Sequence, residues 1–234
     1  GEFSYIDCAL AYAKENLFNG KSKLIDYGKN TYFCPSMCNI KDEQEKSVVE
    51  FSSFSEETAT FGTSLAPFVV REWEACGRKC AYTHIAKGGV SIRYFFHQEM
   101  MEKLNDKIEK YNNNHTEKLP LEPLVEGAGR YFFEKIEDFF KDSAVQFSED
   151  DLTEKCFFWL QGESDAGFPK DLYKLYLEVL WEELKTLGFT RFFCIRAPYW
   201  MDNGDRMANI MQAQEAFCKE LPDAYMLTRV ASFM

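Results

Sequence analysis

The sequence predicts an α/β protein, a three-layer α/β/α sandwich around a mainly parallel sheet, and three observations lead to this fold class. Short apolar runs, typical of buried strands, alternate along the chain with longer segments whose apolar residues recur at helical spacing. Glycine or polar residues follow these runs, as expected where a strand ends. Strands that are separated by amphipathic helices are typical of parallel sheets covered by helices on both faces.

The first third of the chain contains the fewest regular elements. Hydrophobic periodicity predicts helices over residues 5–18 and 62–76. The polar and acidic residues 41–60 between them predict a surface loop. The apolar run 80–85 predicts the first buried strand, and a glycine pair punctuates its end.

The rest of the chain alternates helices and strands with short connections. Helices are predicted over residues 93–111, 130–146, 169–187 and 204–220, and strands over residues 155–160, 191–196 and 224–228. Gly188 follows the third of these helices and is expected to cap its C-terminus.

Composition indicates one domain, residues 1–234, and excludes several classes of partner. A net charge of -11 disfavours nucleic acids and anionic membranes, because like charges repel. No apolar run is long enough to span a bilayer, and the N-terminus lacks the basic start and apolar core of a signal peptide. The 8 cysteines sit partly in apolar runs, which favours reduced core thiols in a cytoplasmic protein over a metal site. No metal and no cofactor is expected, and the oligomeric state is left open.

Ligands of open parallel sheets bind beyond the carboxyl ends of the strands, so the residues there are the candidate site. After the first strand, Gly88 and Gly89 let backbone N–H groups approach a ligand closely. Such donors can form an oxyanion hole for acyl transfer. An ordinary glycine turn between a strand and a helix is the alternative.

The most informative segment is 159–165, Trp-Leu-Gln-Gly-Glu-Ser-Asp, at the end of the second strand. An amide, a glycine and two carboxylates crowd this strand end. The arrangement suits Gln161 as a donor amide and Glu163 as a carboxylate that orients a base. An acidic, solvated loop is the alternative interpretation.

Further candidates flank other predicted strand ends. Trp200 could stack on a sugar ring or pack into the core. Arg93 and Arg196 could each pair with the carboxylate of an acidic sugar such as a sialic acid, or form surface ion pairs.

Four stretches together resemble the sialate O-acetylesterase-like branch of the SGNH (GDSL) hydrolases. They are Phe-Gly-Thr-Ser-Leu-Ala-Pro at 61–67, Ala-Lys-Gly-Gly-Val-Ser-Ile at 86–92, the segment 159–165, and Gln-Ala-Gln-Glu at 212–215. They come in the family's order, with about its spacing, and together they cover residues 60–230.

The resemblance implies a flavodoxin-like SGNH fold and a serine esterase that removes acetyl groups from sugars. It implies that a serine attacks the ester, that a histidine activates the serine, and that a carboxylate positions the histidine. Carried over by position, the catalytic residues would be Gly89 and Gln161 as oxyanion donors and Glu163 as the orienting or substrate-binding carboxylate. Residues expected at the substrate are Gly88, Gly162, Asp165, Arg93 and Trp200.

The chain departs from the family in two places. The family's nucleophile block, Gly-Gln-Ser-Asn or Gly-Asp-Ser, and its closing Asp-x-x-His block are not found, and we expect both to lie outside these residues. Ser4 and Ser36 are weak internal substitutes for the nucleophile, and none of the histidines, at 84, 97 and 115, occupies the family's catalytic position. The alternatives are a non-catalytic, carbohydrate-binding relative and an acetyltransferase on the same fold.

Overall fold

The computed structural model of the protein describes residues 89–147, 154–197 and 206–229 without a break, together with 23–26, 47–50 and most of 72–87. The chain forms two compact units. One comprises residues 1–88 and 131–151, and the other residues 89–130 and 152–234. The predicted helix 5–18 and the segment 61–67 lie outside the described residues.

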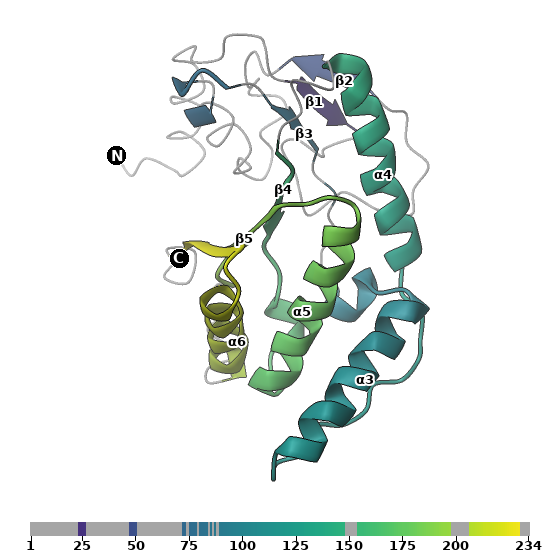
Figure 1. Cartoon of the computed structure of the whole chain (residues 1–234), viewed down its shortest axis with the longest axis vertical. Coiled ribbons are helices and arrows are strands. Elements are labelled where there is room, and N and C mark those ends of the chain that lie inside the picture. The colour runs from purple at the N-terminus through teal and green to yellow at the C-terminus, as the bar shows by residue number, and fades with distance from the viewer. Residues whose placement is uncertain are drawn as a thin grey trace, which may run out of the picture. The chain divides into compact units, whose positions relative to one another are not determined.

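The first unit contains a small mixed sheet. Its strands are β1 (Lys23–Asp26), β2 (Ser47–Glu50) and β3 (Ala81–Tyr82), and β1 pairs antiparallel with β2 and parallel with β3 (Figure 1). β2 lies inside the segment 41–60, so the prediction of a loop there is wrong for these residues. The long helix α4 (Gly129–Gln146) confirms the helix predicted over almost the same residues.

The second unit is built on a parallel sheet, which confirms the predicted α/β fold. Its strands are β4 (Cys156–Trp159), β5 (Arg191–Ile195) and β6 (Ala224–Thr228), in the order β4-β5-β6. Phe157 pairs with Phe192, and Phe192 with Ala224. Because all three strands run the same way, their carboxyl ends share one edge of the sheet.

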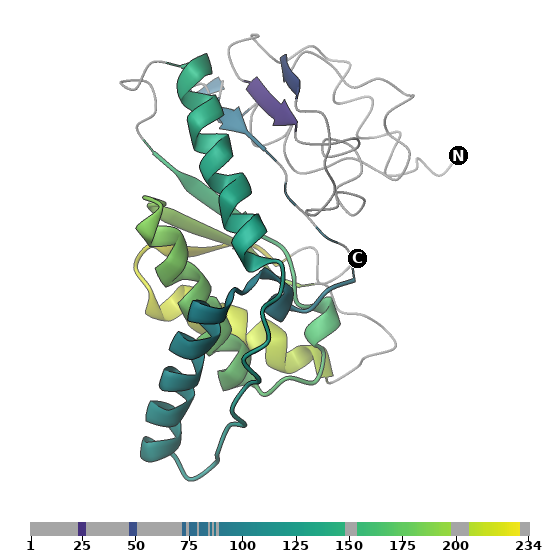
Figure 2. The same ribbon diagram turned by 90° about the vertical axis from the view of Figure 1, so that its right-hand side faces the viewer.

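Two helices cover one face of this sheet, α5 (Lys170–Thr186) and α6 (Arg206–Glu220) (Figure 2). Phe192 of β5 is fully buried and makes edge contacts with Trp181 of α5 and Phe217 of α6, at ring-centroid distances of 5.6 Å and 5.1 Å. Such a contact adds roughly 1 kcal/mol to the burial of the rings themselves. The helical layer is therefore fixed to the sheet through aromatic packing.

A further helix, α3 (Gln98–Asn114), packs along α5 (Figure 1). Its buried face carries Met100, Met101, Leu104 and Ile108. Lysines on α3 also bridge to α5, and Lys107 lies 3.3 Å from Glu178 and 2.9 Å from Glu182. None of the helices in the described part of the chain is long and apolar enough to cross a membrane.

The helix predicted over residues 93–111 is interrupted near its start. A 3-10 helix, η2 (Ile92–Phe95), precedes α3, and residues 127 and 128, later in the chain, bind one carbonyl within η2 and one just after it. Ala128 N donates to Tyr94 O at 2.7 Å, and Gly127 N donates to Phe96 O at 2.9 Å. These carbonyls are thereby lost to a continuous helix, and sequence periodicity could not reveal this because the donors lie about thirty residues away.

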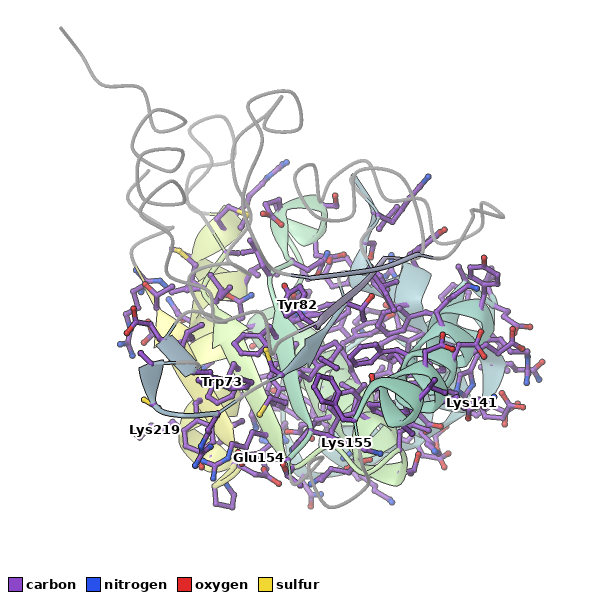
Figure 3. The ribbon with its side chains drawn as sticks, turned by 90° about the horizontal axis from the view of Figure 1, so that it is seen from above. Trp73, Tyr82, Lys141, Glu154, Lys155 and Lys219 are labelled. Carbon is purple, nitrogen blue, oxygen red and sulfur yellow. The ribbon has the colours of Figure 1, made fainter. Side chains whose placement is uncertain are left out.

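The amino end of β4 is held to the end of α5. Glu154 and Lys155 directly precede the strand (Figure 3), and Lys155 Nζ donates to Leu187 O at 3.0 Å while Glu154 pairs with Arg191 of β5. This edge of the sheet therefore has a structural role, and the carboxyl edge is left for the candidate site.

Gly188 closes α5 as the sequence predicts. It adopts a φ of 85°, its N–H donates to Lys185 O at 3.0 Å, and Phe189 N reaches Leu184 O at 3.3 Å. These two bonds form a Schellman motif, which requires a residue that tolerates the left-handed conformation.

We expect Gly188→Ala to lower the free energy of unfolding by about 1 kcal/mol, because alanine is strained at positive φ. Urea denaturation followed by circular dichroism measures this change. Exposed Gly77 also has a positive φ (77°) after a helical turn, where Arg78 N donates to Trp73 O at 3.0 Å, so Gly77→Ala should lower stability by a similar amount, about 1 kcal/mol. An unchanged unfolding midpoint in Gly188→Ala would contradict the capping role.

Candidate functional site

The site begins at a sharp turn where β4 ends. Gly162 has a φ of 140° and is buried. A Cβ atom built there would lie 2.6 Å from Ile210 Cγ2 of α6 and 3.3 Å from both Ala197 Cβ and the Tyr173 hydroxyl. No side chain fits in this space, so glycine is required for the chain to pass between α6 and the strand tips. The turn fixes the directions of its neighbours Gln161 and Glu163.

The glycine-containing loop 89–92 meets this turn, as expected from the sequence. Gln161 Nε2 donates to Val90 O at 3.1 Å. Ser91 Oγ donates to Asp165 Oδ1, and Ile92 N donates to Asp165 Oδ2 at 2.9 Å. Three hydrogen bonds thus join two segments that lie more than seventy residues apart in the sequence.

Backbone donors in this loop remain available. The N–H groups of Gly89, Val90 and Ser91 make no hydrogen bond with the described residues, whereas the next two, of Ile92 and Arg93, are bound to Asp165 Oδ2 and Ser91 Oγ. Gly89 is exposed and has a φ of 70°. Successive free N–H groups next to a residue in the left-handed conformation are typical of anion-binding loops.

Asp165 holds the loop 89–92 in place through its hydrogen bonds with Ser91 Oγ and Ile92 N. It is fully buried and accepts a third hydrogen bond, from Gln161 Nε2 at 2.6 Å. Burial raises the pKa of its carboxyl group, while the hydrogen bonds from Ser91, Gln161 and Ile92 partly oppose this rise. Asp165, expected at the substrate, therefore acts here through the loop that it positions.

We expect the stability of the wild-type protein relative to Asp165→Asn to fall as the pH rises above about 4, the ordinary pKa of an aspartate. The raised pKa means that the folded protein binds the proton more tightly than the unfolded chain, so stability is lost as the carboxyl ionises. Asparagine can accept from Ile92 N and Gln161 Nε2 through its oxygen and donate to Ser91 Oγ through its nitrogen. Urea denaturation of both proteins over this rise in pH measures the difference, and a pH-independent difference would contradict it.

Gln161 is engaged at every polar atom of its side chain. Its Nε2 donates both to Val90 O and to Asp165 Oδ2, and its Oε1 accepts from the Tyr173 hydroxyl at 2.8 Å. Burial raises the pKa of Tyr173, so this hydroxyl remains a donor at neutral pH. The sequence predicts that Gln161 donates to an oxyanion. To do so, Gln161 Nε2 would have to give up its hydrogen bond to Val90 O or its hydrogen bond to Asp165 Oδ2.

A second buried glutamine, Gln214 of α6, connects two strand tips. Its Nε2 donates to Gln161 O at 2.9 Å, and its Oε1 accepts from Ala197 N, after β5, at 2.9 Å. Gln214 is fully buried, and no role in the site was expected for it from the sequence. The available signal was a polar residue among the apolar positions of α6, such as Ile210 and Phe217.

Glu163 is the carboxylate of the site that has no partner among the described residues. It opens the short 3-10 helix η4 (Glu163–Asp165), is half-buried, and makes no hydrogen bond or ion pair with the described residues. This contrasts with Asp165 two positions later, whose oxygens are all engaged inside the protein. Glu163 is thus placed to receive a proton donor from a ligand or from another side chain.

Arg93 lies on the loop side of the site. Its Nε donates to Glu122 Oε2 at 2.5 Å and to the Tyr176 hydroxyl at 3.1 Å, and its guanidinium lies 4.5 Å from the centre of the Phe168 ring. Glu122 is 3% exposed and Arg93 is 44% exposed, so a buried carboxylate fixes a half-open arginine. The Nη groups of Arg93 make no hydrogen bond with the described residues and remain available to an anionic ligand.

The remaining candidates are distributed as follows. His97 pairs with Glu99 (2.8 Å), and His115 stacks on Tyr111 with a ring-centroid distance of 3.8 Å, so both histidines have partners of their own on or beside α3. Arg196 pairs with Glu215 of α6 at 2.7 Å. The residues Gly88, Trp200, Ser4, Ser36 and His84 lie outside the described part of the chain.

The described residues show no group of three or more His, Cys, Asp or Glu side chains arranged to hold a metal ion. Comparison of the chain with protein-family models, with curated protein sequences and with solved structures finds no match. The function is therefore inferred from the residues themselves.

Proposed function

We propose that this chain is a serine esterase of the SGNH type that removes acetyl groups from carbohydrate. The observation that carries the proposal is the meeting of loop 89–92 with the β4 turn, through Gln161 and Asp165. At one edge of a parallel sheet, where such sheets bind ligands, this meeting places backbone N–H groups and a carboxylate that have no partner among the described residues. Both features serve acyl transfer.

The loop 89–92 would stabilise the oxyanion that forms during the reaction. When a serine hydroxyl attacks the acetyl carbonyl, negative charge develops on the carbonyl oxygen, and fixed N–H donors stabilise it. Gly89 N–H is the first candidate donor, since it is exposed and unengaged by described residues. Asp165 and Gln161 hold the loop, so the donors are in place before the reaction begins.

Glu163 would orient the histidine that accepts the proton of the serine hydroxyl. A carboxylate next to the catalytic histidine fixes the tautomer of its ring and stabilises its cation while the sugar hydroxyl leaves. Glu163 is half-buried and has no partner among the described residues, which suits this role or that of an acceptor for a sugar hydroxyl. Neither His97 nor His115 is the proposed partner, because each has its contacts elsewhere.

The test is covalent labelling of the full-length protein with a fluorophosphonate, which reacts with activated serines. We expect one labelled serine, other than Ser91, whose hydroxyl is committed to Asp165, and we expect matching loss of p-nitrophenyl acetate hydrolysis. Mass spectrometry of the digested protein locates the serine. A folded protein that neither takes the label nor hydrolyses the ester would contradict the proposal.

One observation favours a second candidate, a carbohydrate-binding protein without catalysis. Both N–H groups of Gln161 and both oxygens of Asp165 are used internally, and no described histidine reaches the site. The free Glu163 carboxylate and the Arg93 Nη groups would then bind a hydroxyl-rich ligand. This candidate predicts shifts of the backbone amide resonances of 89–93 and 161–165 when an acetylated sugar is added, with no release of acetate.

A further inference from the structure

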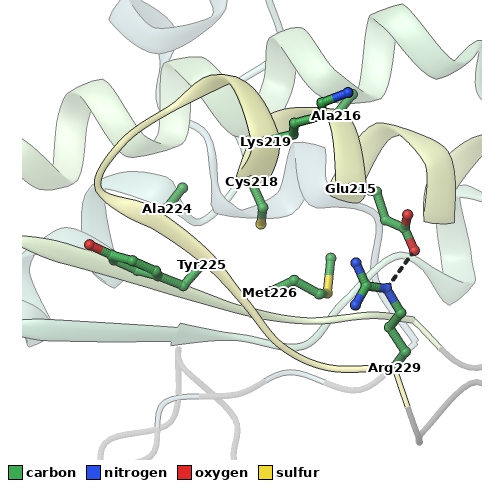
Figure 4. A pocket seen from close by; sticks show the side chains of 8 residues that line it. All are labelled: Glu215, Ala216, Cys218, Lys219, Ala224, Tyr225, Met226 and Arg229. Atoms are coloured by element: carbon green, nitrogen blue, oxygen red, sulfur yellow. Dashed lines mark hydrogen bonds and ion pairs between the residues drawn. The ribbon is translucent and has the colours of Figure 1, made fainter.

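Three sulfur-containing side chains from three different elements meet between the sheet and α6, away from the site described above. Cys194 of β5 stands directly opposite Met226 of β6, so both side chains lie on the same face of the sheet. Cys218 of α6 and Met226 line one pocket of about 410 Å³ between this helix and β6 (Figure 4). Helix and sheet therefore bring Cys194 and Cys218 together.

The two thiols differ in how they can be reached. Cys194 is fully buried, whereas Cys218 is half-buried and its sulfur faces the pocket (Figure 4). A hydrogen bond with Cys218, together with burial, raises the pKa of Cys194 well above its ordinary value. Cys194 therefore stays protonated at neutral pH, and Cys218 is the thiol that a small reagent in the pocket meets first.

We propose that Cys194 and Cys218 form a reversible disulfide when a hydroperoxide enters this pocket. The Cys218 sulfur attacks one peroxide oxygen, the O–O bond breaks, and Cys218 becomes a sulfenic acid while the first water (or alcohol) leaves. The Cys194 sulfur then attacks the Cys218 sulfur, the S–O bond breaks, and a second water carries away the Cys194 proton. Two thiols are oxidised to one disulfide, and one peroxide is reduced.

The position of the pair gives the bond a structural consequence. Cys218 lies one helical turn after Gln214, and Cys194 lies three residues before Ala197, whose N–H binds Gln214. A Cys194–Cys218 disulfide would tie α6 to β5 next to the bridge that Gln214 makes to Gln161. The inference is independent of the proposed esterase activity, because it needs only this pair and its pocket.

The experiment uses the native full-length protein. It is treated with hydrogen peroxide and then denatured in iodoacetamide, so that buried thiols are also blocked, and its peptides are mapped without reduction. We expect a linked pair of peptides containing Cys194 and Cys218, with a mass about 2 Da below the sum of the free peptides, and its disappearance after dithiothreitol. Half-buried Cys156 of β4 and exposed Cys76 serve as internal comparisons, and neither should join the linked pair.

The variants separate this pair from general oxidation. Cys218→Ser should abolish the link to Cys194, while Cys156→Ser should leave its yield unchanged. The wild-type map is decisive even if a variant folds poorly. Two results would overturn the proposal, provided that exposed Cys76 has been oxidised in the same sample. One is that Cys194 and Cys218 are recovered as separately alkylated thiols. The other is that Cys218 is recovered as a sulfinic acid and Cys194 as an alkylated thiol.

Discussion

Replacing Glu163 with alanine is expected to lower the rate of acetyl-ester hydrolysis by about 100-fold, because an orienting carboxylate contributes two or more powers of ten to a serine–histidine mechanism. The side chain is half-buried and has no partner among the described residues, so its loss should not disturb the fold. The measurement is the kcat for p-nitrophenyl acetate hydrolysis by the wild-type and variant proteins, after circular dichroism spectra have shown that both have the same secondary structure.

Two further variants define the origin of this effect. Glu163→Gln retains the size of the side chain and removes its charge, and it should lose nearly as much activity as Glu163→Ala. Ser164→Ala changes the exposed neighbour and should keep the wild-type rate. An unchanged rate in Glu163→Ala would remove this carboxylate from the mechanism.

Gly162→Ala is expected to be the most destabilising single change in the site, lowering the free energy of unfolding by about 4 kcal/mol. The methyl group would come within 2.6 Å of Ile210 Cγ2, and the residue would be held at a φ of 140°. Overpacking and backbone strain each cost roughly 1–3 kcal/mol. Urea denaturation followed by tryptophan fluorescence measures the loss.

Gly89→Ala is the matched control for this experiment. Gly89 also has a positive φ, of 70°, but a Cβ built there would meet nothing within 4 Å, so strain alone should lower the unfolding free energy by about 1 kcal/mol. In addition, Ile210→Ala combined with Gly162→Ala should destabilise the protein by less than the sum of the two single changes, because the first removes the clashing atom. Equal losses in the two glycine variants would show that the close approach of α6 is unimportant.

The regular elements of the second unit could be predicted closely. The strand expected over residues 224–228 is β6 at those residues, and the helix expected over 169–187 is α5 to within one residue at each end. These segments combine strong local periodicity with clear stop signals such as Gly188. Their apolar side chains also face a core, so the pattern and the packing agree.

Shorter or tertiary-dependent elements could not be predicted in this way. β1 and β2 are four-residue strands whose sequences, Lys-Leu-Ile-Asp and Ser-Val-Val-Glu, are too short to show a period, and they exist through pairing with each other. The break between η2 and α3 depends on donors from residues 127 and 128. In both cases the deciding hydrogen bonds come from distant parts of the chain.

In the candidate site, too, some features could be predicted from the sequence and others depend on the tertiary structure. The sequence placed glycines, an amide and carboxylates after two predicted strands. In the described residues β3 and β4 belong to different sheets, so the hydrogen bond from Gln161 Nε2 to Val90 O, at 3.1 Å, joins the two segments in place of a shared sheet. The composition of segment 159–165 could not distinguish its two carboxylates. Asp165 is fully buried with three donors, and Glu163 is half-buried with none among the described residues.

By itself, then, the sequence determined the α/β class, the order of the helices and strands in the second unit, and the strand end at which acidic and amide side chains gather, because each depends on patterns within a few residues. Only the tertiary structure decided that Asp165 holds the loop, that Glu163 makes no hydrogen bond with the described residues, and that Gln214 joins two strand tips. The physical reason is that hydrogen-bond partners 53 to 74 residues apart determine the burial and the charge environment of each group.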